Sequence, residues 1–143
     1  MNTPNSKRKE ISQFLAENES GLLVHLEIIS VRPCEVFDIH VAKHENKDGR
    51  LSHTNLILRI FARDTIDFAI RPKDPNIIMG GAFLKFSTDD PRLNDPRLQY
   101  IPHLDGPVFD PPRRFQLLEL DQSYIIARRF EVEELQRRTW EIP

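Results

Sequence analysis

Hydrophobic and polar residues alternate with a period of two along most of this chain, which is the pattern of β-strands with one buried face. In the cleanest case Ile66, Phe68 and Ile70 share one face while polar residues occupy the other. The pattern predicts about seven strands in all. They are expected at 22–29, 35–44, 53–63, 65–71, 82–86, 115–120 and 124–132.

Short polar segments separate these strands and favour antiparallel pairing. Asp48-Gly49 is the signature of a tight hairpin turn, so we expect 35–44 to pair with 53–63. Asp64 marks the next reversal, which would add 65–71 as a further strand of a meander. A second hairpin turn is expected at Asp121-Gln122-Ser123.

Two segments have helical rather than alternating character. A short helix is predicted at about 5–18, because the spacing of Ile11, Phe14 and Leu15 places them on one face of a helix. The segment 133–140 could end the chain as a second short helix.

Together these elements predict a mainly β protein with a short N-terminal helix and a possible C-terminal one. An antiparallel β-sandwich or open barrel is the expected architecture, since strands of a parallel sheet would show continuous apolar runs. A half-barrel wrapped around a helix is the alternative. The 143 residues fit one domain, residues 1–143.

Charge and cysteine content restrict the kinds of partner and compartment. The 20 basic and 22 acidic residues are mixed along the chain and give a net charge of −2, which argues against nucleic acid as a partner. One cysteine, Cys34, cannot form an internal disulfide, and no signal peptide is evident, so we expect a cytoplasmic protein. No apolar run is long enough for a membrane span.

The segment of about 89–114 is too rich in proline for regular secondary structure and is predicted to be a long loop. Loops of this length in a compact domain are usually functional or disordered. This segment is therefore the first place to look for a function. Its prolines, out of 11 in the chain, are Pro91, Pro96, Pro102, Pro107, Pro111 and Pro112.

A tetrapeptide is duplicated in this loop, as Asp90-Pro91-Arg92-Leu93 and Asp95-Pro96-Arg97-Leu98. Asp before Pro starts a turn, so two successive turns would present the two arginines in the same way. Arginine and aromatic residues are frequent in protein interfaces. The candidate partner-binding residues are Arg92, Arg97, Tyr100, Phe109 and Arg113. A purely structural interpretation is that the loop is rigid and its leucines pack into the core.

The loop also contains many oxygen ligands of the kind that calcium prefers. They are Asp89, Asp90, Asn94, Asp95, Asp105 and Asp110. However, the compact alternating pattern of a calcium loop is absent, and Arg92 and Arg97 are available as counter-ions. We therefore expect these acids to start turns rather than to bind a metal.

Four histidines fall in the first three predicted strands: His25, His40, His44 and His53. Zinc needs three or four such groups converging, but no zinc-site signature is present, so we expect solvent-facing histidines and no metal. Catalytic signatures are missing as well, since Cys34, the serines and Gly80-Gly81 lack the neighbours that nucleophiles or phosphate loops require. No catalytic residue and no cofactor is assigned.

The sequence favours a non-catalytic protein-binding module, such as an inhibitor, an immunity-type protein or an accessory subunit, with the proline-rich loop as contact surface. One alternative is a β-barrel or sandwich that binds a small molecule or calcium. A second is a metal-dependent hydrolase that uses the strand histidines. Sheet edges could also pair between copies, which would give a homodimer.

Overall fold

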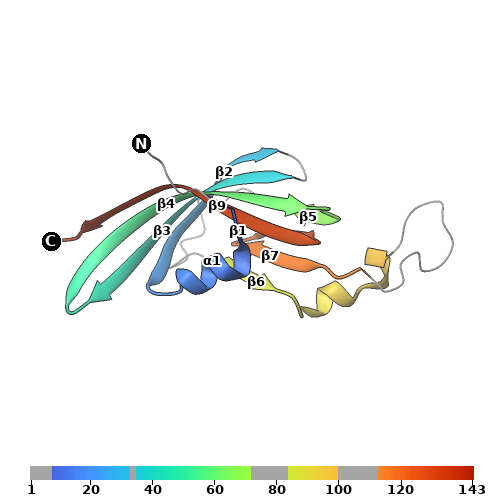
Figure 1. Ribbon diagram of the computed structural model, residues 1–143, viewed down its shortest axis with the longest axis horizontal. Coiled ribbons are helices and arrows are strands. Elements are labelled where there is room, and N and C mark those ends of the chain that lie inside the picture. The colour runs from blue at the N-terminus through green and yellow to red at the C-terminus, as the bar shows by residue number, and fades with distance from the viewer. Residues whose placement is uncertain (1–7, 33–34, 72–83, 100–112) are drawn as a thin grey trace.

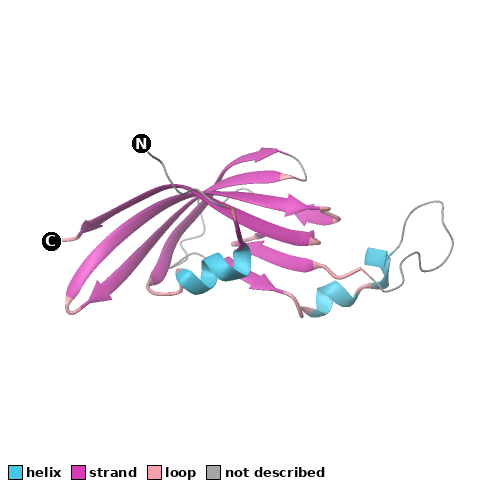
Figure 2. Cartoon of the chain, in the orientation of Figure 1, coloured by secondary structure: helices cyan, strands magenta, loops and turns pink. Residues whose placement is uncertain are grey.

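The computed structural model describes residues 8–32, 35–71, 84–99 and 113–143. Over these residues the protein is mainly β, with two antiparallel sheets, one short α-helix and no closed barrel (Figures 1 and 2). They contain nine strands, more than the sequence predicted. The expected class, an antiparallel β-sandwich, is confirmed.

Sheet A is the larger sheet and has five strands in the order β1-β9-β4-β3-β2. Its strands are β1 (Lys9–Glu10), β2 (Leu22–Arg32), β3 (Val36–Lys47), β4 (Arg50–Arg63) and β9 (Arg129–Glu141). The predicted turn at Asp48-Gly49 joins β3 to β4: both of its residues have positive φ, and Lys47 pairs with Arg50 across it. This hairpin is therefore confirmed.

Sheet B has four strands in the order β5-β8-β7-β6. They are β5 (Asp67–Ala69), β6 (Leu84–Ser87), β7 (Gln116–Leu120) and β8 (Ser123–Ala127). The predicted turn between β7 and β8 is confirmed, because Leu120 pairs with Ser123 across it. Phe68 was expected to face the core but is 40% exposed, because β5 is a short strand at the edge of this sheet.

The two sheets are joined at a corner near Asp64, where φ is 54°. The predicted meander is wrong here: β5 leaves sheet A and pairs with β8 in sheet B. Hydrogen bonds on both sides of the corner keep the two segments of the chain paired. They run from Arg128 N to Arg63 O (2.9 Å) and from Ile66 N to Ile126 O (2.9 Å). The β4–β5 and β8–β9 segments thus pass together from one sheet into the other.

The hydrophobic core lies between the inner faces of the sheets and α1 (Ile11–Glu17). The alternation predicted for β3 is confirmed, since Phe37, Ile39 and Val41 are 0%, 0% and 3% exposed. Sheet A arches over α1, which contributes Ile11 and Phe14 to the core (Figure 1). The fully buried large side chains are Phe37, Phe130, Ile39, Ile60, Leu117, Leu118, Leu120, Ile125 and Val132.

The N-terminal helix is shorter than the predicted range of about 5–18. Lys9 and Glu10 pair with β9 as strand β1, so the helix begins only at Ile11. It ends at Glu17 and is capped by Asn18, whose backbone N–H donates to Phe14 O (3.1 Å). Residues before position 8 lie outside the described part of the chain.

The predicted C-terminal helix at 133–140 is wrong, because this segment belongs to strand β9. Strand β9 pairs with β4 from Arg129 to Glu141 and with β1 on its other edge. The charged residues of this segment have good helix propensity, but a ladder with a long neighbouring strand overrides such a weak local preference.

Candidate functional site

Two matched turns follow β6, as the duplicated tetrapeptide predicted. They are the 3₁₀ turns η1 (Pro91–Asn94) and η2 (Pro96–Gln99). Each begins at an aspartate whose Oδ1 accepts from a backbone N–H: Asp90 from Arg92 (2.9 Å) and Asp95 from Arg97 (2.9 Å). The geometry expected for the first part of the loop is therefore confirmed. We call residues 89–99 the double-turn segment.

The two arginines of the double-turn segment bind the aspartate of their own turn but differ in their further contacts. Arg92 Nε donates to Asp90 Oδ1 (2.9 Å), and its Nη2 also donates to Glu119 Oε1 on β7 (2.9 Å). Arg97 Nε donates to Asp95 Oδ2 (2.9 Å). The Arg97 side chain is 89% exposed, against 49% for Arg92. Arg92 thus anchors the segment to sheet B, whereas Arg97 projects into solvent.

These contacts keep the aspartates ionised. Hydrogen bonds from the Arg92 side chain and backbone lower the pKa of Asp90 to about 2. The corresponding bonds from Arg97 lower the pKa of Asp95, and the pKa of each arginine is raised by its aspartate. Both turns therefore hold an arginine–carboxylate ion pair at neutral pH.

Apolar contacts fasten the underside of the segment. Leu93 and Leu98 pack against a second small core cluster, made of Phe115, Leu117 and Ile126. The expectation that these leucines are directed into the core is confirmed. This anchoring makes the segment rigid without excluding a role for its outer surface.

Arg113, which the sequence suggested as a contact residue, ties the two ends of the long loop together. Its backbone N–H and carbonyl both bond to the Gln99 side-chain amide, at 2.8 and 2.7 Å. Its Nη2 donates to Leu98 O (2.6 Å), and its guanidinium lies 5.1 Å from the centre of the Phe115 ring. The other two predicted contact residues, Tyr100 and Phe109, lie outside the described residues.

The described acids of the proposed calcium set already have partners. Asp90 and Asp95 hold their arginines, and Asp89 Oδ1 accepts from Ser87 Oγ (2.9 Å). Asp90 and Asp95 start turns, as expected. Asp105 and Asp110 lie outside the described part of the chain.

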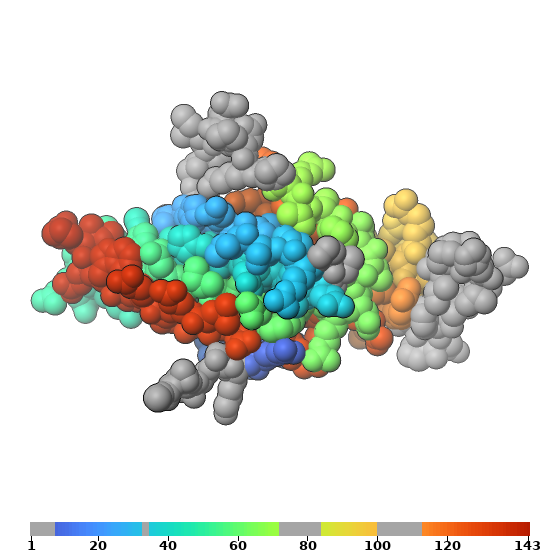
Figure 3. All heavy atoms as spheres, turned by 90° about the horizontal axis from the view of Figure 1, so that it is seen from above, coloured from blue at the N-terminus to red at the C-terminus, as the bar shows by residue number. Residues whose placement is uncertain are grey.

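The four strand histidines converge on the outer face of sheet A, which sequence reasoning did not foresee. Figure 3 shows this sheet from above, with β2, β3, β4 and β9 side by side. Three of the histidines, His40, His44 and His53, are linked with Asn55 by hydrogen bonds, and the His25 and His40 rings lie 5.0 Å apart. We call these four histidines and Asn55 the histidine ladder.

The bonds of the histidine ladder run across two strands. His44 Nε2 lies 2.8 Å from His53 Nδ1, and His53 Nε2 lies 3.0 Å from Asn55 Oδ1. His40 Nε2 lies 3.2 Å from the same oxygen. Trp140 of β9 extends the ladder, because its ring centre lies 4.6 Å from that of His53. The ladder residues are half-buried on the outer face of sheet A.

A signal for part of this ladder was present in the sequence. A two-residue turn at Asp48-Gly49 makes Lys47 and Arg50 a pair, and the pairing continues residue by residue away from the turn. Three residues further along each strand, His44 therefore lies opposite His53. The position of His25 could not be predicted in this way, since β2 has a register shift between Ile28 and Ser30, which lie between His25 and the Arg32–Val36 pair.

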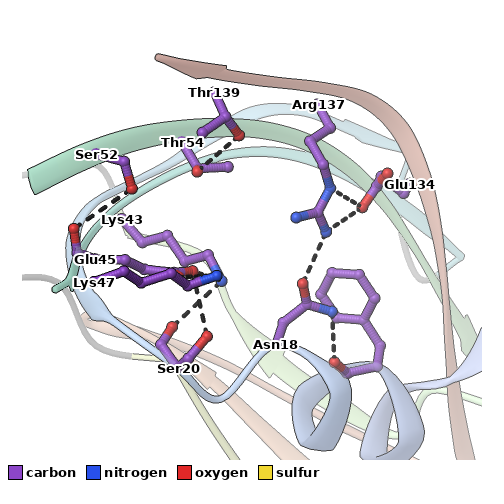
Figure 4. Close-up of polar contacts among 11 residues, drawn as sticks. Asn18, Ser20, Lys43, Glu45, Lys47, Ser52, Thr54, Glu134, Arg137 and Thr139 are labelled. Carbon is purple, nitrogen blue, oxygen red and sulfur yellow. Dashed lines mark hydrogen bonds and ion pairs between the residues drawn. The ribbon is translucent and has the colours of Figure 1, made fainter. Parts of the chain in front are cut away.

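A polar group occupies the inner face of sheet A beyond the end of α1 (Figure 4). Lys43 Nζ binds Glu45 Oε1 (2.9 Å) and Ser20 O (3.3 Å), and contacts with Lys43 lower the pKa of Glu45. Arg137 Nη2 donates to Asn18 Oδ1 (2.8 Å), which ties β9 to the helix terminus. Polar side chains of β3, β4 and β9 thus lie near the residues that follow α1, with Lys43 buried and Arg137 exposed.

Comparison with known proteins identifies no relative: no family model, curated protein or solved structure matches this chain. Among the described residues, no helix is long and apolar enough to cross a membrane.

Proposed function

We propose that this protein is a non-catalytic protein-binding module and that the double-turn segment, together with the rest of the long loop, forms its contact surface. The observation that carries this proposal is the pair of aspartate-started turns that hold Arg92 and Arg97 in fixed, similar conformations. The contact residues proposed are Arg92, Arg97, Tyr100, Phe109 and Arg113.

Rigidity is the physical reason why such a segment suits recognition. A loop that is already ordered loses less conformational entropy when a partner binds. Leucines beneath it, the Arg92–Glu119 contact and the Gln99–Arg113 bonds all restrict its motion before any partner arrives.

Arg97 is the more exposed of the two arginines and would make the first contact. Its guanidinium has donors beyond those used by Asp95, so the partner group is expected to be a carboxylate or a carbonyl oxygen. Arg92, in contrast, is held by two carboxylates and supports the surface from below.

Replacing these arginines one at a time tests the proposal. Arg97→Ala should reduce capture of the partner from a lysate of the source cells by roughly 30-fold, the effect of losing an interface hot spot. Its melting temperature should not change, because the side chain is exposed. Arg92→Ala should lower the melting temperature as well, since it breaks the bond to Glu119.

Arg128→Ala is the matched control, because Arg128 is also exposed and paired, but with Asp64 at the corner between the sheets. It should capture the partner like the wild type. If Arg97→Ala captures the same proteins in the same amounts as Arg128→Ala, the contact surface is not the double-turn segment.

Small-molecule binding is a second candidate function, supported by the group of polar side chains on the inner face of sheet A (Figure 4). Lys43, Thr54 and Arg137 would offer charged and hydroxyl groups to a polar ligand. A bound ligand raises the melting temperature according to its affinity. A metabolite panel that leaves the wild-type melting temperature unchanged would speak against this candidate.

A cytoplasmic location is proposed because the one cysteine, Cys34, suits a reducing compartment, where no disulfide is needed. A homodimer through the edge strand β2 is proposed as the assembly state, since this strand exposes Leu22, Ile29 and Val31 at the free edge of sheet A.

A further inference from the structure

The strongest unexplained feature outside the proposed contact surface is the β2 end of the histidine ladder. His25, Glu27 and His40 each direct one ligand atom toward a common point, and these three atoms lie within 4.8 Å of one another. His25 Nε2 lies 3.5 Å from Glu27 Oε2. Among the described residues, this is the group whose donors are of the metal-binding type.

Strand register explains why the three side chains meet. Glu27 of β2 lies directly opposite His40 of β3, and His25 lies opposite Ala42. Residues 25 and 27 of β2 and residues 40 and 42 of β3 all point to the same face of the sheet. The side chains of His25, Glu27 and His40 therefore surround the small side chain of Ala42. Ala42 is only 3% exposed although it lies on the outer face, which fits a floor covered by the rings around it.

The hydrogen bond between His40 and Asn55 selects the tautomer of the neutral His40 ring. Asn55 Oδ1 is a carbonyl oxygen and can only accept, so His40 and His53 both donate to it from Nε2. A neutral His40 then keeps a lone pair on Nδ1. Ligand histidines in metal sites generally donate their other N–H to such an oxygen, which orients the ring.

We propose that His25, Glu27 and His40 bind a divalent transition-metal ion such as Zn²⁺, with Asn55 as a positioning residue. Two imidazoles and one carboxylate are a common donor set for this class of ion. The remaining coordination positions face solvent, because the site lies on the outer face of sheet A. This proposal does not depend on the protein-binding function.

The three groups need only a small adjustment to bind the ion. With zinc–nitrogen distances of about 2.0–2.1 Å, two ligand atoms of a tetrahedral ion lie roughly 3.3 Å apart. His25 Nε2 and Glu27 Oε2 are already 3.5 Å apart, and none of the three separations exceeds 4.8 Å. The Glu27 side chain, which is 61% exposed, is free to adjust. The histidines can remain on their strands.

Titration of the full metal-free chain with Zn²⁺ alone, followed by calorimetry, tests this proposal. We expect one ion per chain. His40→Ala and Glu27→Gln should each weaken binding by more than about tenfold, because each removes a ligand. If His40→Ala does not fold, Glu27→Gln carries the test, since its side chain is exposed and its shape is kept.

Variants of Asn55 test its positioning role. Asn55→Leu should weaken Zn²⁺ binding by about 10-fold, the usual effect of losing a group that orients a ligand. Asn55→Asp keeps an acceptor for both imidazoles and should bind like the wild type. Replacing Zn²⁺ by Co²⁺ should give visible absorption bands in the wild type and in Asn55→Asp that are absent in His40→Ala.

His44→Ala is the matched control, because His44 belongs to the same ladder but lies outside the proposed site. It should bind Zn²⁺ within about twofold of the wild type, since it contacts neither ligand histidine. Failure of the wild type to bind Zn²⁺ would overturn the proposal. So would retention of binding in His40→Ala, or a loss in His44→Ala as large as that in His40→Ala.

Discussion

Asp90 combines two roles in one side chain: it starts the turn η1 and it pairs with Arg92. Both roles favour the ionised carboxylate. The usual pKa of an aspartate is 3.8, whereas these bonds lower the pKa of Asp90 to about 2.

This shift predicts how stability depends on pH. A carboxyl whose pKa is lower in the folded state stabilises the fold above its unfolded pKa, and this contribution is lost as pH falls through the folded value. The melting temperature of the wild type should therefore fall between about pH 4 and about pH 2. Asp90→Asn keeps an acceptor for the Arg92 N–H but has no charge to titrate, so its decline should be shallower. Equal slopes in thermal melts would contradict this prediction.

Gly21, in the link between α1 and β2, has little room for a side chain. Its φ is +92°, and an added Cβ would lie 2.6 Å from Glu45 Cγ and 2.8 Å from the backbone oxygen of His44. That oxygen belongs to a strand ladder and cannot move away easily. Gly21→Ala should therefore lower the free energy of unfolding by more than about 1 kcal/mol.

Gly49→Ala is the control for this prediction. Gly49 also has positive φ, +80°, but nothing lies within 4 Å of an added Cβ. Its cost should be limited to about 1 kcal/mol for the left-handed conformation. Urea unfolding compares the two variants, and an equal or greater loss in Gly49→Ala would show that crowding at Gly21 is unimportant.

Elements governed by neighbouring residues were predictable from the sequence. The two hairpin turns, the alternation in β3 and the double turn of the loop depend on local turn chemistry and on side-chain period. The histidine ladder depends on register across two strand pairs, and one of these contains an irregularity. Only the pairing of His44 with His53 could be read from the chain.

Strand β9 could not be predicted, because its conformation is set by distant residues. Its charged second half resembles a solvent-exposed helix, and only β4, many residues earlier in the chain, makes it a strand. The corner at Asp64 is similar, since whether the chain folds back or changes sheets is decided by the availability of β8.

Strand β9 should be essential to the core through its first half. Phe130 is fully buried and meets Phe86 of sheet B edge-on, with ring centres 6.5 Å apart. Phe130→Ala should lower the free energy of unfolding by about 3–5 kcal/mol. Leu135→Ala, on the same strand but 40% exposed, should change it by less than about 0.5 kcal/mol. Chemical denaturation of both variants checks the contrast, and similar losses would contradict it.

Among the strands that the structure describes, those at the ends of each sheet have a neighbour on one side only. In sheet A the edge strand β2 has register shifts at two places, which reduce but do not remove its ability to pair. Exposed Leu22, Ile29 and Val31 add apolar surface at this edge.

If two copies pair through β2, the protein should sediment as a dimer at high concentration and dissociate on dilution. Ile29→Lys should shift it to the monomer, because a charged side chain on an edge strand opposes pairing. Leu51→Lys, a similarly exposed position near the β3–β4 turn, should not. Sedimentation of the wild type as a monomer at all concentrations would exclude this assembly.

The position of β9 also affects how the chain folds as it is synthesised. Strands β2, β3 and β4 pair through short connections and can form soon after they leave the ribosome, whereas β4 must wait for β9, which is synthesised many residues later. During that interval β4 has an unpaired edge, which invites aggregation or pairing with another nascent chain. A chain released before Arg129 would keep this edge permanently open, so β9 protects the edge of β4.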